Sequence, residues 1–137
     1  MDIQAKNYRV LLVDDEQNVL NALRRELTTP PLGRHHYDVE TFTSATEALE
    51  RAKEQPFDLV ISDYLMPAMD GLKLLRFAVS SGMDKNRIVI LSGRDADFLH
   101  NVCPMGTCLA VLNKFEARQK SVLDMVFNSL NQKAGAA

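Results

Sequence analysis

The sequence predicts an α/β domain built on a doubly wound parallel sheet. Short apolar runs alternate with stretches of helical periodicity five times along the chain. Four of the five runs consist of unbroken aliphatic residues, which is typical of strands covered on both faces, as in parallel sheets. Such alternation forms right-handed crossovers and places helices on both sides of one sheet. We therefore expect the strands to be buried inside the domain.

Each expected strand is a short apolar or half-polar segment. Turn residues such as Gln55-Pro56, Ser81-Gly82 and Met105-Gly106 separate these segments from the helical stretches. The third expected strand is fully aliphatic, whereas the second is half polar. The five strands are expected at residues 10–13, about 38–42, 59–61, 88–91 and 110–112.

Apolar stripes at helical spacing lie between the strands. The clearest stripe predicts a last helix from about Glu116 to Leu130. Thr43 or Ser44 is expected to cap the second helix, with Glu47 able to complete a capping box. The other stripes are Val19, Leu20, Leu23 and Leu27; Ala45, Ala48, Leu49 and Ala52; Leu72, Leu75 and Val79; and a shorter one of Phe98, Leu99 and Val102.

Length and composition indicate a single globular domain. The 137 residues are 46% hydrophobic and 25% charged, which is ordinary for a domain of this size. We expect one domain over 1–137, with its core at about 8–130 and a tail or linker at 131–137. A net charge of -2 and a pI near 5.9 argue against direct nucleic-acid binding. Without an apolar run of about 20 residues or a signal pattern, we expect a cytoplasmic protein with no membrane partner.

The cysteines and histidines do not form a recognisable metal motif. Cys103 and Cys108 bracket the turn before the last expected strand. A zinc site needs about four ligands, and His35, His36 and His100 are not spaced to supply them. Both cysteines are therefore interpreted as small buried apolar side chains. A disulfide between them is not expected in a reducing compartment.

Acidic side chains follow two strands that we expect to be neighbours. Asp14 and Asp15 follow the first strand directly, and Asp63 lies two residues beyond the third apolar run. Adjacent acids at a strand end also suit a turn or a helix cap, a role open to Asp15. The carboxyl ends of parallel strands nevertheless converge on one ligand site, and crowded carboxylates raise each other's pKa unless a cation lies among them. Magnesium prefers oxygen ligands and recruits phosphate, so a phosphate-handling Mg²⁺ site is predicted.

A lysine and a serine follow the two remaining strands. Lys114 can neutralise phosphate oxygens, although a lysine at a strand end is often only a solvated charge. Ser92 can donate a hydrogen bond to another phosphate oxygen. Asp63 can itself act as a nucleophile and form an aspartyl-phosphate. These groups together favour phosphoryl chemistry at one edge of the sheet.

Four segments carry a resemblance to a known family. They are LLVDDE at 11–16, DYLMPAMDG at 63–71, SG at 92–93 and NKF at 113–115, in that order. The chain resembles a receiver domain of bacterial two-component response regulators over about Tyr8 to Leu130. The resemblance implies a flavodoxin-like sheet of strand order 2-1-3-4-5 flanked by five helices.

The resemblance also implies roles for single residues. Asp63 matches the phosphoacceptor that takes a phosphoryl group from a phosphohistidine. Ser92 and Lys114 match the hydroxyl and the ammonium that contact the bound phosphoryl group. Gly93 and Arg94 would flank the pocket. The domain would catalyse only its own phosphoryl transfer and dephosphorylation.

The implied Mg²⁺ ligands come from two segments. They are the carboxylates of Asp14, Asp15 and Asp63, together with the backbone carbonyl of Leu65. The side chains of Leu65 and Arg94 would also hinder the water that attacks the aspartyl-phosphate. The implied partners are a sensor histidine kinase or a histidine phosphotransfer protein, and an effector domain or downstream protein. A second copy of the chain, forming a homodimer, is another partner that the resemblance allows.

Three features depart from the family pattern on the side that transmits the signal. Val111 occupies the position of the usual switch aromatic, and Phe115 follows Lys114 where the family usually has proline. The fourth helix is short and ends near Cys103. We therefore expect phosphorylation to be normal and the signal to leave through a different motion or partner surface.

Other functions compete with a phosphorylatable receiver, whether stand-alone or the excised module of a larger regulator. The second alternative is a pseudo-receiver, which would bind proteins without being phosphorylated. The departures from the family pattern at Val111 and Phe115 are compatible with it. A flavodoxin-like or phosphohydrolase enzyme is the third reading. The acids at 14–16 are opposite in charge to a flavin phosphate loop, and the chain has no spare length for the cap of a phosphatase.

Overall fold

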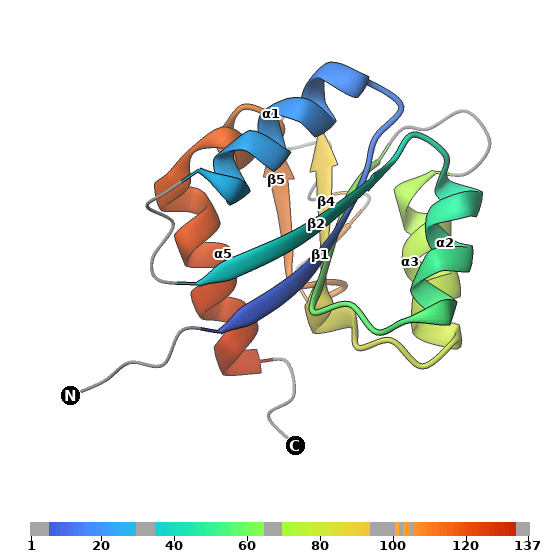
Figure 1. Cartoon of the computed structure of the whole chain (residues 1–137). Helices are drawn as coiled ribbons and strands as arrows, with labels where there is room; N and C mark the ends of the chain where they lie inside the picture. Colours follow the sequence, from blue (N-terminus) through green and yellow to red (C-terminus); the bar gives the residue numbers. More distant parts are fainter. Residues whose placement is uncertain are drawn as a thin grey trace.

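The computed structural model forms one parallel sheet between two layers of helices (Figure 1). The structure describes residues 6–29, 35–64, 70–93, 101, 103–104 and 106–133. The strands are β1 (Asn7–Val13), β2 (His36–Phe42), β3 (Leu59–Asp63), β4 (Ile88–Ser92) and β5 (Ala110–Asn113). The helices are α1 (Gln17–Thr28), α2 (Ala45–Glu54), α3 (Gly71–Ser80) and α5 (Lys120–Lys133), with short 3₁₀ turns at η1 (Lys85–Arg87) and η2 (Glu116–Arg118).

The order of the strands is β2-β1-β3-β4-β5, and every neighbouring pair is parallel. The predicted doubly wound, flavodoxin-like sheet is therefore confirmed. Of the five expected helices, four lie among the described residues. Phe98, Leu99 and Val102 of the expected fourth helix lie outside them, although Asn101 is described and helical. The helices that are described are each too short or too polar to span a bilayer.

The prediction for the start of the last helix was wrong. Residues Glu116–Arg118 form a 3₁₀ turn, and Gln119 is extended, with φ of −92° and ψ of 130°. The Glu116 carboxylate accepts a hydrogen bond from the backbone N–H of Asn113 at 3.1 Å, which binds this segment to the end of β5. The α-helix therefore begins only at Lys120 and continues to Lys133.

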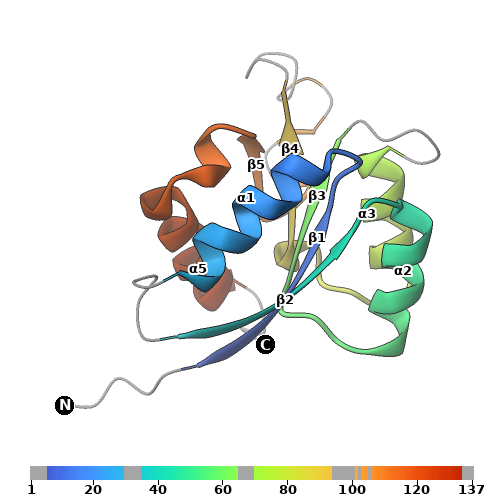
Figure 2. The same ribbon diagram turned by 45° about the horizontal axis from the view of Figure 1, so that its top comes forward.

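The two faces of the sheet carry separate apolar cores. Figure 2 shows α1 and α5 on one side of the sheet and α2 and α3 on the other. Alternate residues of a strand point to opposite faces, so Leu12 packs on the α1 and α5 side and Leu11 on the α2 and α3 side. Both cores are fully buried around the central strands β1, β3 and β4. This packing holds the ends of the three strands in fixed positions relative to one another.

The expectation that all strands are buried was wrong for the two edges of the sheet. Strands β3 and β4 are buried at every residue. In β5 all four residues are half-buried, and in β2 only Tyr37 is buried. Each edge strand has a single neighbour, so fewer atoms cover its outer side.

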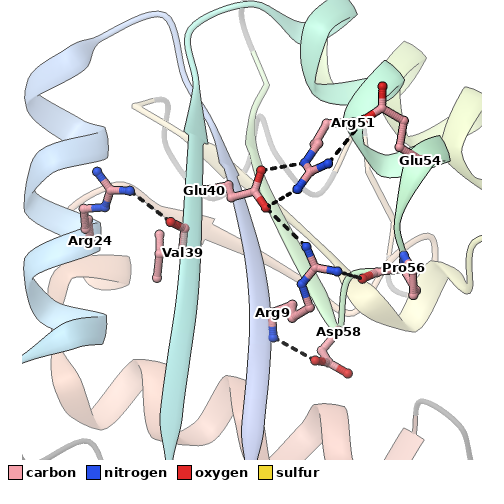
Figure 3. Close-up of polar contacts among 8 residues, drawn as sticks. All are labelled: Arg9, Arg24, Val39, Glu40, Arg51, Glu54, Pro56 and Asp58. Carbon is pink, nitrogen blue, oxygen red and sulfur yellow. Dashed lines mark hydrogen bonds and ion pairs between the residues drawn. The ribbon is translucent and has the colours of Figure 1, made fainter.

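A polar network joins the edge strand β2 to β1 and α2 (Figure 3). The Glu40 carboxylate accepts hydrogen bonds from Arg51 Nε at 2.7 Å and Nη2 at 3.0 Å, and from Arg9 Nη2 at 3.2 Å. The hydrogen bonds from Arg51 hold the pKa of Glu40 below its usual value. On the other side, Arg24 of α1 donates to the carbonyl oxygen of Val39 at 2.9 Å. The edge strand is thus held by charged side chains as well as by its one neighbour.

Side-chain caps begin two of the helices. Ser44 Oγ accepts a hydrogen bond from the N–H of Glu47 at 3.4 Å, so of the two expected candidates, Thr43 and Ser44, it is Ser44 that caps α2. Asp70 Oδ1 accepts from the N–H of Lys73 at 2.9 Å and begins α3. Each cap satisfies an N–H group that has no partner inside its own helix.

Candidate functional site

The end of β1 holds the first acidic side chain in a fixed orientation. The N–H of Asp14 donates to the carbonyl of Phe42 at 3.1 Å, which extends the β1–β2 pairing by one residue. The N–H of Glu16 then donates to Asp14 Oδ1 at 2.8 Å, and the chain turns into α1. Asp14 is 0% exposed. Its carboxylate is therefore fixed below the surface, whereas Asp15 is exposed.

Asp63 lies on the adjacent strand at the same edge of the sheet. Strands β1 and β3 are paired so that Val13 is opposite Ser62, which places Asp14 and Asp63 one residue further along. Asp63 is the last residue of β3 and is 4% exposed. The strand pairing alone therefore brings two buried carboxylates together.

Lys114 reaches the same place from the far edge of the sheet. The β4–β5 register pairs Ser92 with Asn113, and the N–H of Lys114 donates to the carbonyl of Ser92 at 3.0 Å. From there its Nζ lies 3.1 Å from Asp14 Oδ2 and 3.4 Å from Asp63 Oδ2. Nζ also lies 3.0 Å from Glu16 Oε1. One ammonium thus contacts three carboxylates from two strand ends.

Burial and mutual repulsion disfavour ionised carboxylates at this site. Burial, followed by repulsion from Asp14, raises the pKa of Asp63 to about 6 despite the attraction of Lys114. Burial also raises the pKa of Asp14, and the hydrogen bonds from Glu16 and Lys114 offset this only in part. Burial alone would lower the pKa of Lys114, but the surrounding carboxylates outweigh it and the pKa is raised. Among the described residues of the site, the acids carry more negative charge than Lys114 neutralises.

The arrangement suits a small divalent cation. Carboxylate oxygens of Asp14, Asp15 and Glu16 all lie within 4.8 Å of one another. The 3.1 Å contact of Lys114 with Asp14 Oδ2 is an ion pair, and this buried oxygen accepts no hydrogen bond from any described residue. Mg²⁺ takes one or two carboxylates together with water and phosphate oxygens. The buried carboxylate of Asp14, beside the exposed carboxylates of Asp15 and Glu16, fits such an ion.

The remaining residues singled out from the sequence lie in different places. Ser92 ends β4 and is 1% exposed, and Gly93 follows it at the surface. Val111 is half-buried in β5 and packs on the α2 and α3 side of the sheet. Leu65 and Arg94 lie outside the described residues.

Glu16 is the contact that sequence reasoning missed. Its carboxylate makes a 3.0 Å ion pair with Lys114, as short as any contact of that lysine. The signal was present as the third consecutive acid after the first strand. Its significance depended on where Lys114 would lie, which is set by strands far away in the sequence.

Comparison with known proteins agrees with this geometry. The family model described as the response regulator receiver domain matches residues 10–124. This chain belongs to the response regulator receiver domain family. Receiver domains are modules of phosphorylation-based two-component signalling and not classical enzymes, and the family binds Mg²⁺ at its acidic pocket.

Full-length relatives are much longer than this receiver domain. This chain is 40% identical over 102 residues to the two-component response regulator ARR10 of Arabidopsis thaliana, and the aligned region covers 73% of this chain and 17% of that protein. It is 36% identical over 88 residues to the response regulator MprA of Mycobacterium leprae, covering 64% of this chain and 36% of that protein. The chain thus spans about a sixth to a third of these relatives.

Solved structures show the same fold. An uncharacterized protein from Neptuniibacter caesariensis is 33% identical, with a TM-score of 0.75 over 98% of both chains. The chemotaxis response regulator CheY4 of Vibrio cholerae superimposes with a TM-score of 0.73 at 24% identity, over 93% of this chain and 99% of that one. The second similarity concerns the fold alone.

Proposed function

We propose that this receiver domain accepts a phosphoryl group on Asp63 from the phosphohistidine of a sensor histidine kinase or a histidine phosphotransfer protein, in a Mg²⁺-dependent reaction. The observation that supports it best is the placement of the Lys114 ammonium within 3.4 Å of the buried carboxylates of Asp63 and Asp14. Both the attacking acid and a charge-neutralising group are then in place before a phosphodonor arrives.

Asp63 is the nucleophile in this proposal. With a pKa of about 6, most of its carboxylate is ionised at neutral pH. One carboxylate oxygen attacks phosphorus, the P–N bond to the donor histidine breaks, and the imidazole leaves with the bonding electrons. The Ser92 hydroxyl and the Lys114 ammonium bind the phosphoryl oxygens, where extra negative charge collects.

Asp14 and Asp15 are the proposed metal ligands at the end of β1. The hydrogen bond from Glu16 N–H orients Asp14 and leaves its Oδ2 directed at the site. When bound, Mg²⁺ would neutralise charge on the attacking carboxylate and the incoming phosphoryl group. Asp63 and the backbone carbonyl of Leu65 complete the proposed ligand set, the latter on the resemblance to the family. The proposed pocket-flanking roles of Gly93, Leu65 and Arg94 rest on the same resemblance.

Phosphorylation would alter partner or effector interactions through β5. Lys114 is joined to the end of that strand, so any movement toward a phosphoryl group pulls on it. Val111 lacks a ring, so the signal would leave by another motion. We propose a cytoplasmic receiver with its core at about residues 8–130, acting on an effector domain or a separate protein.

Intact-mass spectrometry tests the proposal. The protein is incubated with acetyl phosphate, with and without Mg²⁺, beside Asp63→Ala and the control Asp38→Asn, which changes an exposed aspartate on β2. We expect one added phosphoryl group in the wild type and the control, only with Mg²⁺, and none in Asp63→Ala. A folded wild type that gains no phosphoryl group from acetyl phosphate or a phosphohistidine donor would favour the pseudo-receiver instead.

A further inference from the structure

Two buried cysteines lie in contact just before β5. Cys103 and Cys108 are 2% and 8% exposed, and both are free thiols. Their Sγ atoms are 3.8 Å apart. The sequence analysis expected buried apolar side chains, and burial is confirmed. The contact between the two sulfur atoms was not expected and gives the pair a chemistry of its own.

The turn between the two cysteines holds them together. Thr107 donates to the carbonyl of Pro104 from both its N–H, at 3.1 Å, and its Oγ1, at 2.6 Å. Gly106 has a φ of +92°, a conformation that glycine adopts without strain. These features fold the chain back on itself, so the two thiols meet.

The second cysteine is anchored to the sheet. Cys108 Sγ lies 3.3 Å from the carbonyl oxygen of Ala110, and the adjacent N–H of Leu109 donates to the carbonyl of Ile88 at 2.9 Å. Cys108 therefore has a fixed position at the entrance of β5. Movement that brings the two sulfur atoms closer would come mainly from Cys103 and the turn.

The pair is chemically unequal. The contact with Cys108 Sγ, with a smaller contribution from Thr107, lowers the pKa of Cys103 to about 7 despite the opposing effect of burial. The same interaction with Cys103, followed by burial, raises the pKa of Cys108. The thiolate is the reactive form, so Cys103 would be the nucleophile at neutral pH.

We propose that Cys103 and Cys108 form a reversible dithiol–disulfide site, oxidised by a low-molecular-weight disulfide such as glutathione disulfide. A disulfide bond is about 2.05 Å long, so the sulfur atoms, now in van der Waals contact, need to approach by less than 2 Å. In reducing compartments, disulfides that do form are mostly transient and redox-sensing. Pro104 and Gly106, which lie between the two cysteines in the sequence, are exposed, so we expect the reagent to reach the pair from this side.

The reaction proceeds in two exchange steps. The Cys103 thiolate attacks one sulfur of glutathione disulfide, and one glutathione leaves as its thiolate. Cys108 then attacks the Cys103 sulfur of the mixed disulfide, and the second glutathione leaves. The two protein thiols lose two electrons and two protons, which reduce glutathione disulfide to two glutathione molecules. Excess glutathione drives the same steps backwards.

Mass spectrometry of the whole chain tests the site. The reduced protein is equilibrated in glutathione buffers of increasing disulfide content, quenched with acid and alkylated. We expect both thiols to disappear together, with no glutathione added. The tryptic peptide 95–114, which contains both cysteines, should become lighter by two hydrogens. Cyanogen bromide cleaves at Met105, between the cysteines, so the two fragments should separate only after reduction.

A single variant tests whether Cys108 resolves the mixed disulfide. Cys108→Ser retains Cys103 and should accumulate the glutathione mixed disulfide that the wild type does not, with far-UV circular dichroism as the check on folding. The proposal is overturned if the native wild type keeps both thiols while the urea-unfolded chain is oxidised, or if it collects mixed or intermolecular disulfides instead. The wild-type result is decisive even where a variant fails to fold, and it does not depend on phosphorylation.

Discussion

The Lys114 ammonium lies 3.4 Å from the Asp63 carboxylate, although the two residues end strands that are not neighbours. Strand β4 lies between them, so the lysine side chain extends over the end of β4, where Ser92 is located. The same ammonium contacts Asp14 and Glu16. A change of charge on Asp63 therefore alters the electrostatic interactions of Lys114, at the end of β5, and through it those of Asp14 and Glu16, at the end of β1.

Replacing Asp63 by asparagine should stabilise the fold at high pH. The pKa of Asp63 is raised from 3.8 to about 6, so its contribution to stability is complete below pH 4 and is lost as pH rises through 6. This shift corresponds to about 3 kcal/mol, which Asp63→Asn would recover at pH 8. Urea denaturation in EDTA at pH 4 to 8 measures the difference. Equal or lower stability of the variant at pH 8 would contradict the argument; Asp38→Asn, an exposed site, is the control.

Removing the Lys114 charge should raise the pKa of Asp63 further. Lys114 attracts the ionised carboxylate and partly offsets the effects of burial and Asp14. In Lys114→Met, the Asp63 carboxyl should titrate above pH 6, as followed by carbon NMR. Lys133→Met changes an exposed cation at the end of α5 and should leave the titration unchanged. An unaltered titration in Lys114→Met would mean that the 3.4 Å contact carries little energy.

Mg²⁺ should stabilise the wild type and have little effect on Asp15→Asn. At a concentration of 100 times Kd, a ligand specific for the folded state adds about 2.7 kcal/mol, a shift in Tm on the order of 10 °C. The matched control Glu50→Gln removes an exposed acid on α2 and should respond like the wild type. The shift should also shrink as pH falls below 6, because protons compete for Asp63. A full shift in Asp15→Asn would exclude its carboxylate as a ligand.

The two helix caps should differ in strength. The bond from Lys73 N–H to Asp70 is 2.9 Å long, and the one from Glu47 N–H to Ser44 is 3.4 Å. A carboxylate also interacts favourably with the positive end of the helix. We expect Asp70→Ala to cost about 1–2 kcal/mol and Ser44→Ala about 0.5 kcal/mol. Chemical denaturation of both variants measures this order, and the reverse order would contradict it.

Two residues of α5 offer a matched test of the core. Leu123 is 0% exposed in the core on the α1 and α5 side, whereas Met125 is 67% exposed. Leu123→Ala should cost about 2–5 kcal/mol because it leaves a cavity. Met125→Ala should change stability by less than about 0.5 kcal/mol. Similar losses in both variants would show that this helix is not packed as described.

From the sequence alone we predicted the sheet, the approximate positions of its strands and the acidic residues near their ends. Strands β3, β4 and β5 each continue one or two residues beyond the expected end, so Asp63 is the last residue of β3. Apolar runs and helical stripes depend on neighbours in the chain, so these patterns identified β3 and β4 and a helix cap at Thr43 or Ser44. The segment that begins at Asp63 was long enough to indicate the family before any contact was known.

Only the tertiary structure decided which side chains meet and which are covered. The pairing of strands brings Lys114 to Glu16 and Asp63, a contact that depends on register across the whole sheet. The exposure of the edge strands and the contact of Cys103 with Cys108 likewise depend on long-range packing and on the path of a turn. Local sequence patterns reflect the conformational preference of a residue and its neighbours in the chain. Distances of 3–4 Å between side chains that are remote in sequence are instead set by strand register and tertiary packing.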